Sequence, residues 1–120
     1  MKISQFLHSA ILVSDLEKSN YFYGEVLNLK QIERSLSFAG TWYQVGEFQL
    51  HLIAANQVTL DTVNNEKWGR NRHLAFSIED IEVAKQHLSE YNYPFQMSSS
   101  GRAALFVQDP DGNIIELNQA

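Results

Sequence analysis

Hydrophobic residues in the first half of the chain follow two kinds of pattern, one typical of strands and one typical of helices. Residues 6–13 are almost continuously apolar, which predicts a strand covered on both faces. The sequence Ser-Asp-Leu-Glu at residues 14–17 can then form a capping box that starts a helix, along which apolar residues recur at helical spacing until Asn28. Three shorter segments predict strands at residues 30–37, 41–45 and 48–53.

The second half of the chain predicts the same order of elements. A strand at residues 73–78 leads to a helix that Asp80 can cap and that Asn92 ends. Three more strands are expected, at residues 95–98, 103–108 and 113–118. The turn sequence at residues 109–112 joins the last two, because its proline fixes φ and its glycine accepts a positive φ.

The two halves also correspond residue by residue, at an offset of 65 positions. His8 corresponds to His73, and His51 corresponds to Glu116. A repeat of this length indicates a duplicated structural unit. We therefore predict a single α+β domain built from two tandem βαβββ modules. The first module, a linker and the second module are expected at residues 1–55, 56–72 and 73–120.

Composition narrows the possible chemistry. Nine Lys and Arg against fourteen Asp and Glu give a net charge of −5, which argues against nucleic acid as a partner. The absence of cysteine leaves His, Asp and Glu as the strong metal ligands. No apolar run approaches the roughly 20 residues of a membrane-spanning helix, and the first residues do not look like a secretory signal. We therefore expect a cytoplasmic protein that binds no membrane.

Side chains of metal-ligand type interrupt four of the apolar strands at equivalent positions of the repeat. They are His8, His51, His73 and Glu116. A single histidine in an apolar strand is more often a hydrogen-bonded core residue than a ligand. That interpretation has to explain four matching interruptions, one of which buries a carboxylate at a cost of several kcal/mol if it is unpaired. We therefore predict one divalent site for Zn, Ni, Co, Mn or Fe.

The sequence resembles the vicinal oxygen chelate superfamily, which includes glyoxalase I, fosfomycin resistance proteins, extradiol dioxygenases and bleomycin resistance proteins. The stretches that carry the resemblance are His8, residues 22–29, 46–52 and 73–76, and the closing Asp-Pro-Asp-Gly-Asn-Ile-Ile-Glu-Leu at 109–117. The resemblance implies a cupped mixed sheet with helices on the outside and a divalent metal ion inside. It also implies a homodimer, in which many members build each site from modules of different chains.

The resemblance implies a role for each of the four side chains. His8, His73 and Glu116 match the superfamily's metal-binding positions, while His51 matches a position that varies among members. In a glyoxalase-like isomerisation, a glutamate next to the metal moves a proton between two carbons. Glu116 is therefore the candidate base, and His51 is the second candidate catalytic residue.

Further residues are candidates for substrate binding. If Gly46–Glu47 forms a two-residue hairpin, Trp42 lies opposite His51, and Trp42 and Gln49 line the pocket. Ordinary sheet packing is an equally good explanation for Trp42.

Three arginines near the predicted site, Arg70, Arg72 and Arg102, suit a substrate carboxylate or phosphate, because a guanidinium group can bind such anions through two hydrogen bonds. Loop arginines are more commonly solvated, so this alternative stays open for each of them.

These features predict a metal-dependent lyase or isomerase that acts on a small molecule with adjacent oxygens chelated to the metal. One alternative is a ring-cleaving dioxygenase of the extradiol type. The other is a non-catalytic dimer that binds a ligand in the manner of bleomycin resistance proteins.

Overall fold

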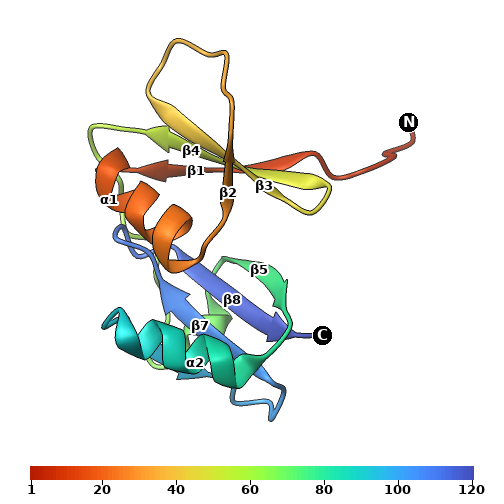
Figure 1. The fold of residues 1–120 in the computed structure, drawn as a ribbon, viewed down its shortest axis with the longest axis vertical. Coiled ribbons are helices and arrows are strands. Elements are labelled where there is room, and N and C mark those ends of the chain that lie inside the picture. Colours follow the sequence, from red (N-terminus) through yellow and green to blue (C-terminus); the bar gives the residue numbers. More distant parts are fainter. The chain divides into compact units, whose positions relative to one another are not determined.

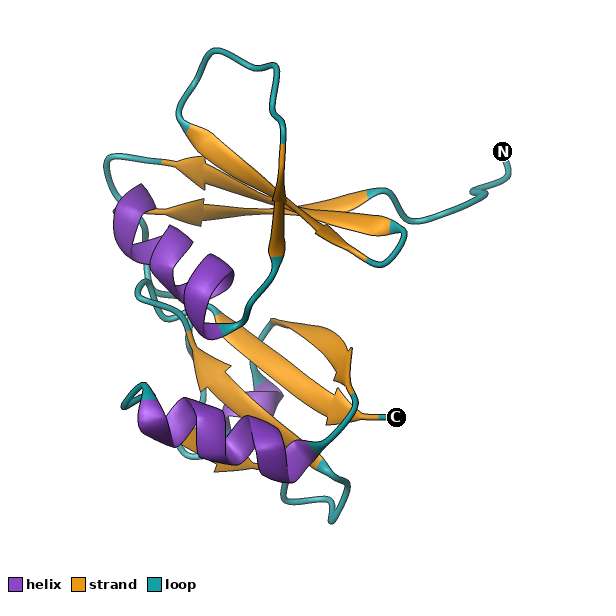
Figure 2. Ribbon diagram, in the orientation of Figure 1, coloured by secondary structure: helices purple, strands orange, loops and turns teal.

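The computed structural model describes residues 1–120, which divide into two compact units, Met1–Val58 and Thr59–Ala120 (Figure 1). Each unit contains one four-stranded mixed sheet and a helical segment along one face of it (Figure 2). The predicted α+β fold of two βαβββ modules is thereby confirmed.

The elements of the first unit are β1 (His8–Val13), α1 (Leu16–Asn20), a π-helix (Tyr21–Val26), β2 (Lys30–Ile32), β3 (Gly40–Val45) and β4 (Phe48–Ala54). The strand order is β1-β4-β3-β2, with β1 parallel to β4. Asp15 caps α1 by accepting a hydrogen bond from the Lys18 amide at 3.1 Å. Asn28, at a φ of 58°, reverses the chain after the π-helix.

The elements of the second unit are a 3₁₀ turn (Trp68–Arg70), β5 (His73–Ile78), α2 (Ile81–Glu90), β6 (Phe95–Met97), β7 (Ala104–Gln108) and β8 (Ile114–Gln119). The strand order β5-β8-β7-β6 repeats that of the first unit, and β5 is parallel to β8. Asp80 caps α2, and Asn92 at a φ of 60° follows its end.

Successive side chains of the central strands point to opposite sides of the sheet, which gives each sheet a core face and a second face. Leu50 and Leu52 of β4 are fully buried in the core, where α1 packs against the sheet. Ile115 and Leu117 occupy the equivalent core positions on β8. Since successive strand residues point to opposite faces, His51 and Glu116 belong to the second face of their sheets.

Strand β1 differs from its prediction. It begins at His8 rather than at Phe6, and its side chains alternate between exposed and partly buried instead of being covered on both faces. The physical reason is its position: β1 is an edge strand that pairs only with β4. Phe6, Leu7 and Leu12 are accordingly exposed within the first unit.

Two other expectations are refined. The strand predicted at 30–37 ends at Ile32. The stretch predicted as a linker is ordered from Thr59 onward as part of the second unit, and its buried Asn71 bonds to the backbone of the segment. No helix of the structure has the length and hydrophobicity to span a membrane.

Candidate metal centre

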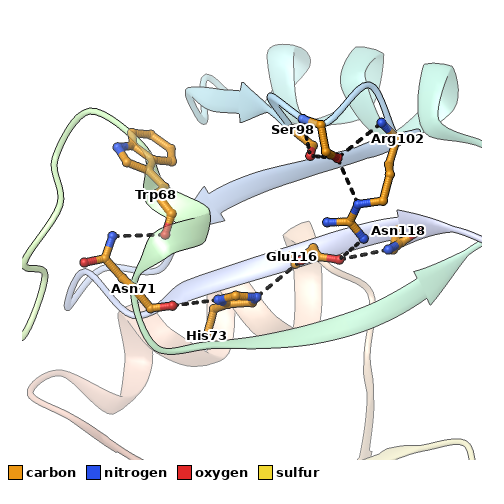
Figure 3. Close-up of polar contacts among 8 residues, drawn as sticks. Trp68, Asn71, His73, Ser98, Arg102, Glu116 and Asn118 are labelled. Atoms are coloured by element: carbon orange, nitrogen blue, oxygen red, sulfur yellow. Dashed lines mark hydrogen bonds and ion pairs between the residues drawn. The ribbon is translucent and has the colours of Figure 1, made fainter.

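The second unit brings His73 and Glu116 together. In the parallel pairing of β5 and β8, Ala75 lies beside Glu116, so His73 is its diagonal neighbour on the same face. His73 Nε2 lies 3.3 Å from Glu116 Oε1 (Figure 3). The Glu116 side chain is 7% exposed and the His73 side chain is 25% exposed, so one end of the pair remains accessible.

A backbone carbonyl orients the His73 ring. His73 Nδ1 lies 2.7 Å from the Asn71 oxygen. A carbonyl oxygen only accepts, so Nδ1 carries a proton, and in the neutral ring Nε2 presents a lone pair to the carboxylate. Two acceptors at this distance repel each other unless a proton or a cation joins them. The pair is therefore either an imidazolium–carboxylate ion pair or two ligands turned toward one cation.

The other oxygen of Glu116 has two polar neighbours. Oε2 accepts a hydrogen bond from Asn118 Nδ2 at 2.9 Å and lies 3.6 Å from Arg102 Nη1. Phe106, directly opposite Glu116 on β7, contacts the His73 ring edge-on with ring centroids 5.5 Å apart. The carboxylate is thus buried beside groups that compensate its negative charge, which lowers the free-energy cost of burying it in the ionised form.

The first unit brings His8 and His51 together, in a different geometry. Their rings are stacked, with centroids 4.1 Å apart and an interplanar angle of 15°. Trp42 stacks on the other face of His51, at 4.2 Å and 9°. The strand pairing places Trp42 directly opposite His51 and Val45 opposite Phe48, so the predicted hairpin register is confirmed.

A relay of side-chain amides fixes the His51 tautomer. Gln44 Nε2 donates to the carbonyls of Gly46 and Phe48, at 2.8 and 3.2 Å, which turns Gln44 Oε1 toward Gln49 Nε2 at 3.4 Å. The Gln49 oxygen then faces His51 Nε2 at 2.8 Å. His51 Nε2 therefore carries the proton, and Nδ1 is left as the acceptor.

Electrostatics keep the His51 ring neutral. Burial, together with the positive charges of His8 and Arg34, lowers the pKa of His51 below its usual value. Neutral imidazole is the form that binds metal ions. However, an imidazole binds an ion in its ring plane, and the planes of His8 and His51 are nearly parallel. One of the two rings would have to turn before both could hold the same ion.

Three of the four residues predicted to bind substrate lie next to the candidate metal ligands. Gln49 and Trp42 contact His51, and Arg102 approaches Glu116, as described above. Arg72 does not join them: its side chain is 90% exposed and lies 3.5 Å from Asp61. A role for Arg72 in substrate binding stays a prediction from sequence alone.

Sequence reasoning missed two amides, Asn118 and the buried Asn71. Each stands two positions from a predicted ligand along the strand direction, Asn118 after Glu116 and Asn71 before His73. For Asn118, a polar residue at this spacing was the available signal, because residues i and i+2 share a face of a strand. The contact of Asn71 to His73 uses a backbone carbonyl, which any residue type supplies, so the sequence carried no signal for it.

Taken by itself, neither unit gathers three His, Asp or Glu side chains into a metal site. Each unit contributes a pair, and the sharing of one ion by the two pairs stays a prediction. The second pair has the chemistry that such an ion needs: a ring nitrogen held by its backbone hydrogen bond and a buried carboxylate, both of which suit a borderline divalent metal.

Comparison with known proteins agrees with this architecture. A family model described as the Glyoxalase/Bleomycin resistance protein/Dioxygenase superfamily matches residues 5–117. The chain belongs to this superfamily. It is 28% identical to a "Probable lactoylglutathione lyase" of Synechocystis, with 94% of this chain and 93% of that protein covered.

Solved structures of the superfamily share the fold. A glyoxalase family protein from Enterococcus faecalis matches with a TM-score of 0.77 and 26% identity, over 99% of this chain and all of that one. The fosfomycin resistance protein FosX from Listeria monocytogenes matches with a TM-score of 0.78 at 18% identity, over 98% and 91% of the two chains. At 18% identity, the similarity to FosX concerns the fold alone.

Proposed function

We propose that this superfamily member is a metal-dependent lyase or isomerase that acts on a small molecule with two adjacent oxygens. The observation that carries the proposal is the His73–Glu116 pair, in which the Asn71 carbonyl leaves Nε2 turned toward a buried carboxylate. The similarity to a protein named as a lactoylglutathione lyase supports the reaction class.

The candidate ligands are His73 and Glu116 of one unit and His8 of the other, from one chain or from the two chains of a homodimer. His51 is the fourth candidate, although its ring now stacks on His8. A bound Zn, Ni, Mn, Co or Fe ion would supply Lewis acidity toward the substrate's neighbouring oxygens.

Two side chains are suited to moving a proton. Asn118 holds Oε2 of Glu116, which fixes the orientation of the carboxylate that is the candidate proton acceptor. His51 offers Nδ1 as an acceptor, because Gln49 occupies Nε2.

Metal content tests the proposal. Protein purified without added metal should contain about one equivalent of divalent ion per site by elemental analysis, and His73→Ala should lose it. Glu116→Gln, which keeps the side chain's volume, should lose it too. His87→Ala on α2 serves as the matched control and should retain the metal. Metal-free wild-type protein that takes up none of the five ions on dialysis would overturn the proposal.

One observation favours a second candidate, a non-catalytic ligand-binding protein. Arg102, Asn118 and a protonated His73 together satisfy Glu116 without any metal ion. If this candidate is right, the protein binds ligand equally well after chelation, and no turnover appears with any metal. Assays with methylglyoxal hemithioacetal, fosfomycin and catechols separate the lyase, transferase and dioxygenase chemistries of the superfamily from one another.

A further inference from the structure

A pocket of about 410 Å³ lies in the second unit, next to the His73–Glu116 pair. Its floor is Phe106, the same ring that contacts His73. One wall is the turn that carries Lys67 and Arg70, and the facing wall is the loop from Ser98 to Arg102. Figure 3 shows Arg102 between this serine loop and Glu116.

The pocket concentrates positive charge in an acidic chain. Three of the nine Lys and Arg residues line it, Lys67, Arg70 and Arg102, against a single carboxylate, Glu66. Neither Lys67 nor Arg70 forms an ion pair in the structure, and Arg102 pairs only with Glu116, at 3.6 Å. With Glu116 counted against Arg102, the lining still has an excess of one positive charge in a protein of net charge −5.

Hydrogen bonds hold the turn that carries two of these cations. Gln96 on β6 accepts from the Trp68 amide at 2.8 Å and donates to the Glu66 carbonyl at 2.7 Å. Asn71 donates to the Trp68 carbonyl at 3.0 Å, which closes the turn from its other end. A Cβ on Gly69 would lie 2.5 Å from the Phe106 ring, so the turn is seated directly on the pocket floor. Cations on a fixed backbone lose less conformational entropy when they bind a ligand.

The facing wall supplies hydroxyl groups. Ser98 Oγ and Ser100 Oγ lie 2.8 Å apart, and Arg102 Nε donates to Ser100 Oγ at 3.0 Å. A serine hydroxyl can rotate to donate to an oxyanion, and a guanidinium group can bind one through two parallel hydrogen bonds. Arginine, lysine and serine on opposite walls are a complementary set for carboxylate or phosphoryl oxygens.

We propose that this pocket binds an oxyanion, a carboxylate or a phosphoryl group, at the end of the substrate remote from the metal. The inference rests on the proposed function in naming the ligand as part of the substrate. The substrate class is then a small anion whose charged group lies at the other end of the molecule from the two oxygens that the metal would bind. Lys67, Arg70 and Arg102 determine this specificity.

Backbone-amide NMR on the metal-free protein tests the pocket independently of catalysis. Inorganic phosphate and acetate, titrated at constant ionic strength, represent the two anion classes. Saturable shifts are expected at residues 66–71 and 98–102, and the anion with the lower Kd identifies the class. Arg70→Ala should weaken binding by about tenfold, as expected for loss of a charge-assisted contact. Lys85→Ala, which removes a cation on α2 outside the pocket lining, is the control and should leave the Kd unchanged.

Shifts that do not saturate, or an equal Kd in Arg70→Ala and wild-type protein, would overturn the proposal. The metal-content experiment gives a separate answer. If phosphate or acetate saturates the pocket in a protein that takes up no metal, the pocket stands and the proposed enzyme does not. If metal binds but neither anion does, the pocket is wrong and the metal centre stands.

Discussion

Asn71→Ala tests how the second unit holds its site. Asn71 Oδ1 accepts from the amides of Val63 and Asn64, at 2.7 and 2.9 Å. Its Nδ2 donates to the carbonyls of Asn64 and Trp68, at 2.8 and 3.0 Å. Alanine removes these four hydrogen bonds and a longer fifth one, from Nδ2 to the Lys67 carbonyl at 3.5 Å, while leaving the backbone carbonyl that contacts His73.

The expected loss of stability follows from these bonds. At ~0.5–1.5 kcal/mol each, four hydrogen bonds sum to ~2–6 kcal/mol. The bonds share one side chain and are not additive, and the released segment can open locally, so the lower end of this range is expected. We predict a fall of ~2–3 kcal/mol in the free energy of unfolding of the second unit.

Urea unfolding measures the loss of stability, and amide hydrogen exchange locates the part of the second unit that opens. Protection should be lost first at residues 63–71, while the strands β7 and β8 remain protected. Asn65→Ala is the matched control, because an exposed substitution next to the network should change stability by less than ~0.5 kcal/mol. Metal affinity should also fall by about tenfold, since the lost side-chain bonds hold in place the backbone carbonyl of residue 71 that orients His73. A stability loss below ~0.5 kcal/mol with unchanged exchange would refute this account of the segment.

Three further predictions concern other parts of the chain. In metal-free protein, NMR should give His51 a pKa below 6.5, because the ring is partly buried and lies near His8 and Arg34. Since the unfolded chain takes up this proton more readily, the free energy of unfolding should rise with pH up to about 6.5. This pH dependence should vanish in a His51→Ala variant, and a His51 pKa at or above 6.5 would contradict the prediction. Tyr43→Phe should cost ~1 kcal/mol in thermal or urea unfolding, because the buried phenol, whose pKa burial raises to about 12, donates to Asn20 at 2.7 Å; no change would show that this bond contributes nothing. Gly69→Ala should cost ~1–3 kcal/mol, because the added Cβ meets the Phe106 ring, and a neutral result would mean that the turn moves freely.

Features that depend on local pattern or on the repeat could be predicted from the sequence. The caps Asp15 and Asp80 lie where their side chains satisfy the first free amides of each helix. The hairpin at Gly46 fixed the pairing of Trp42 with His51, because a two-residue turn leaves one register. The equivalent positions of the candidate ligands in the repeat were also predicted, and the structure places each pair on neighbouring parallel strands.

Features that depend on packing or on distant partners could not be predicted. An apolar run does not say how many neighbours a strand has, so the edge position of β1 was missed. The bond from Gln96 to Trp68 joins residues 28 positions apart and has no local signature. The stacking of His8 on His51 depends on side-chain rotamers, which strand periodicity leaves open.

The two pairs of candidate ligands occupy equivalent positions of the repeat but differ in their chemistry. Each unit uses the residue two positions before a histidine to fix its tautomer, Gln49 through its side chain and Asn71 through its backbone. The result is opposite: His51 keeps its proton on Nε2, and His73 keeps it on Nδ1. Only His73 then presents a free Nε2 to a carboxylate, while His51 lies between two aromatic rings. The equivalence of His51 and Glu116 in the repeat therefore concerns position on the strand rather than chemistry, and for that reason the proposal of a metal centre rests first on the His73–Glu116 pair, with His8 and His51 as the further candidate ligands.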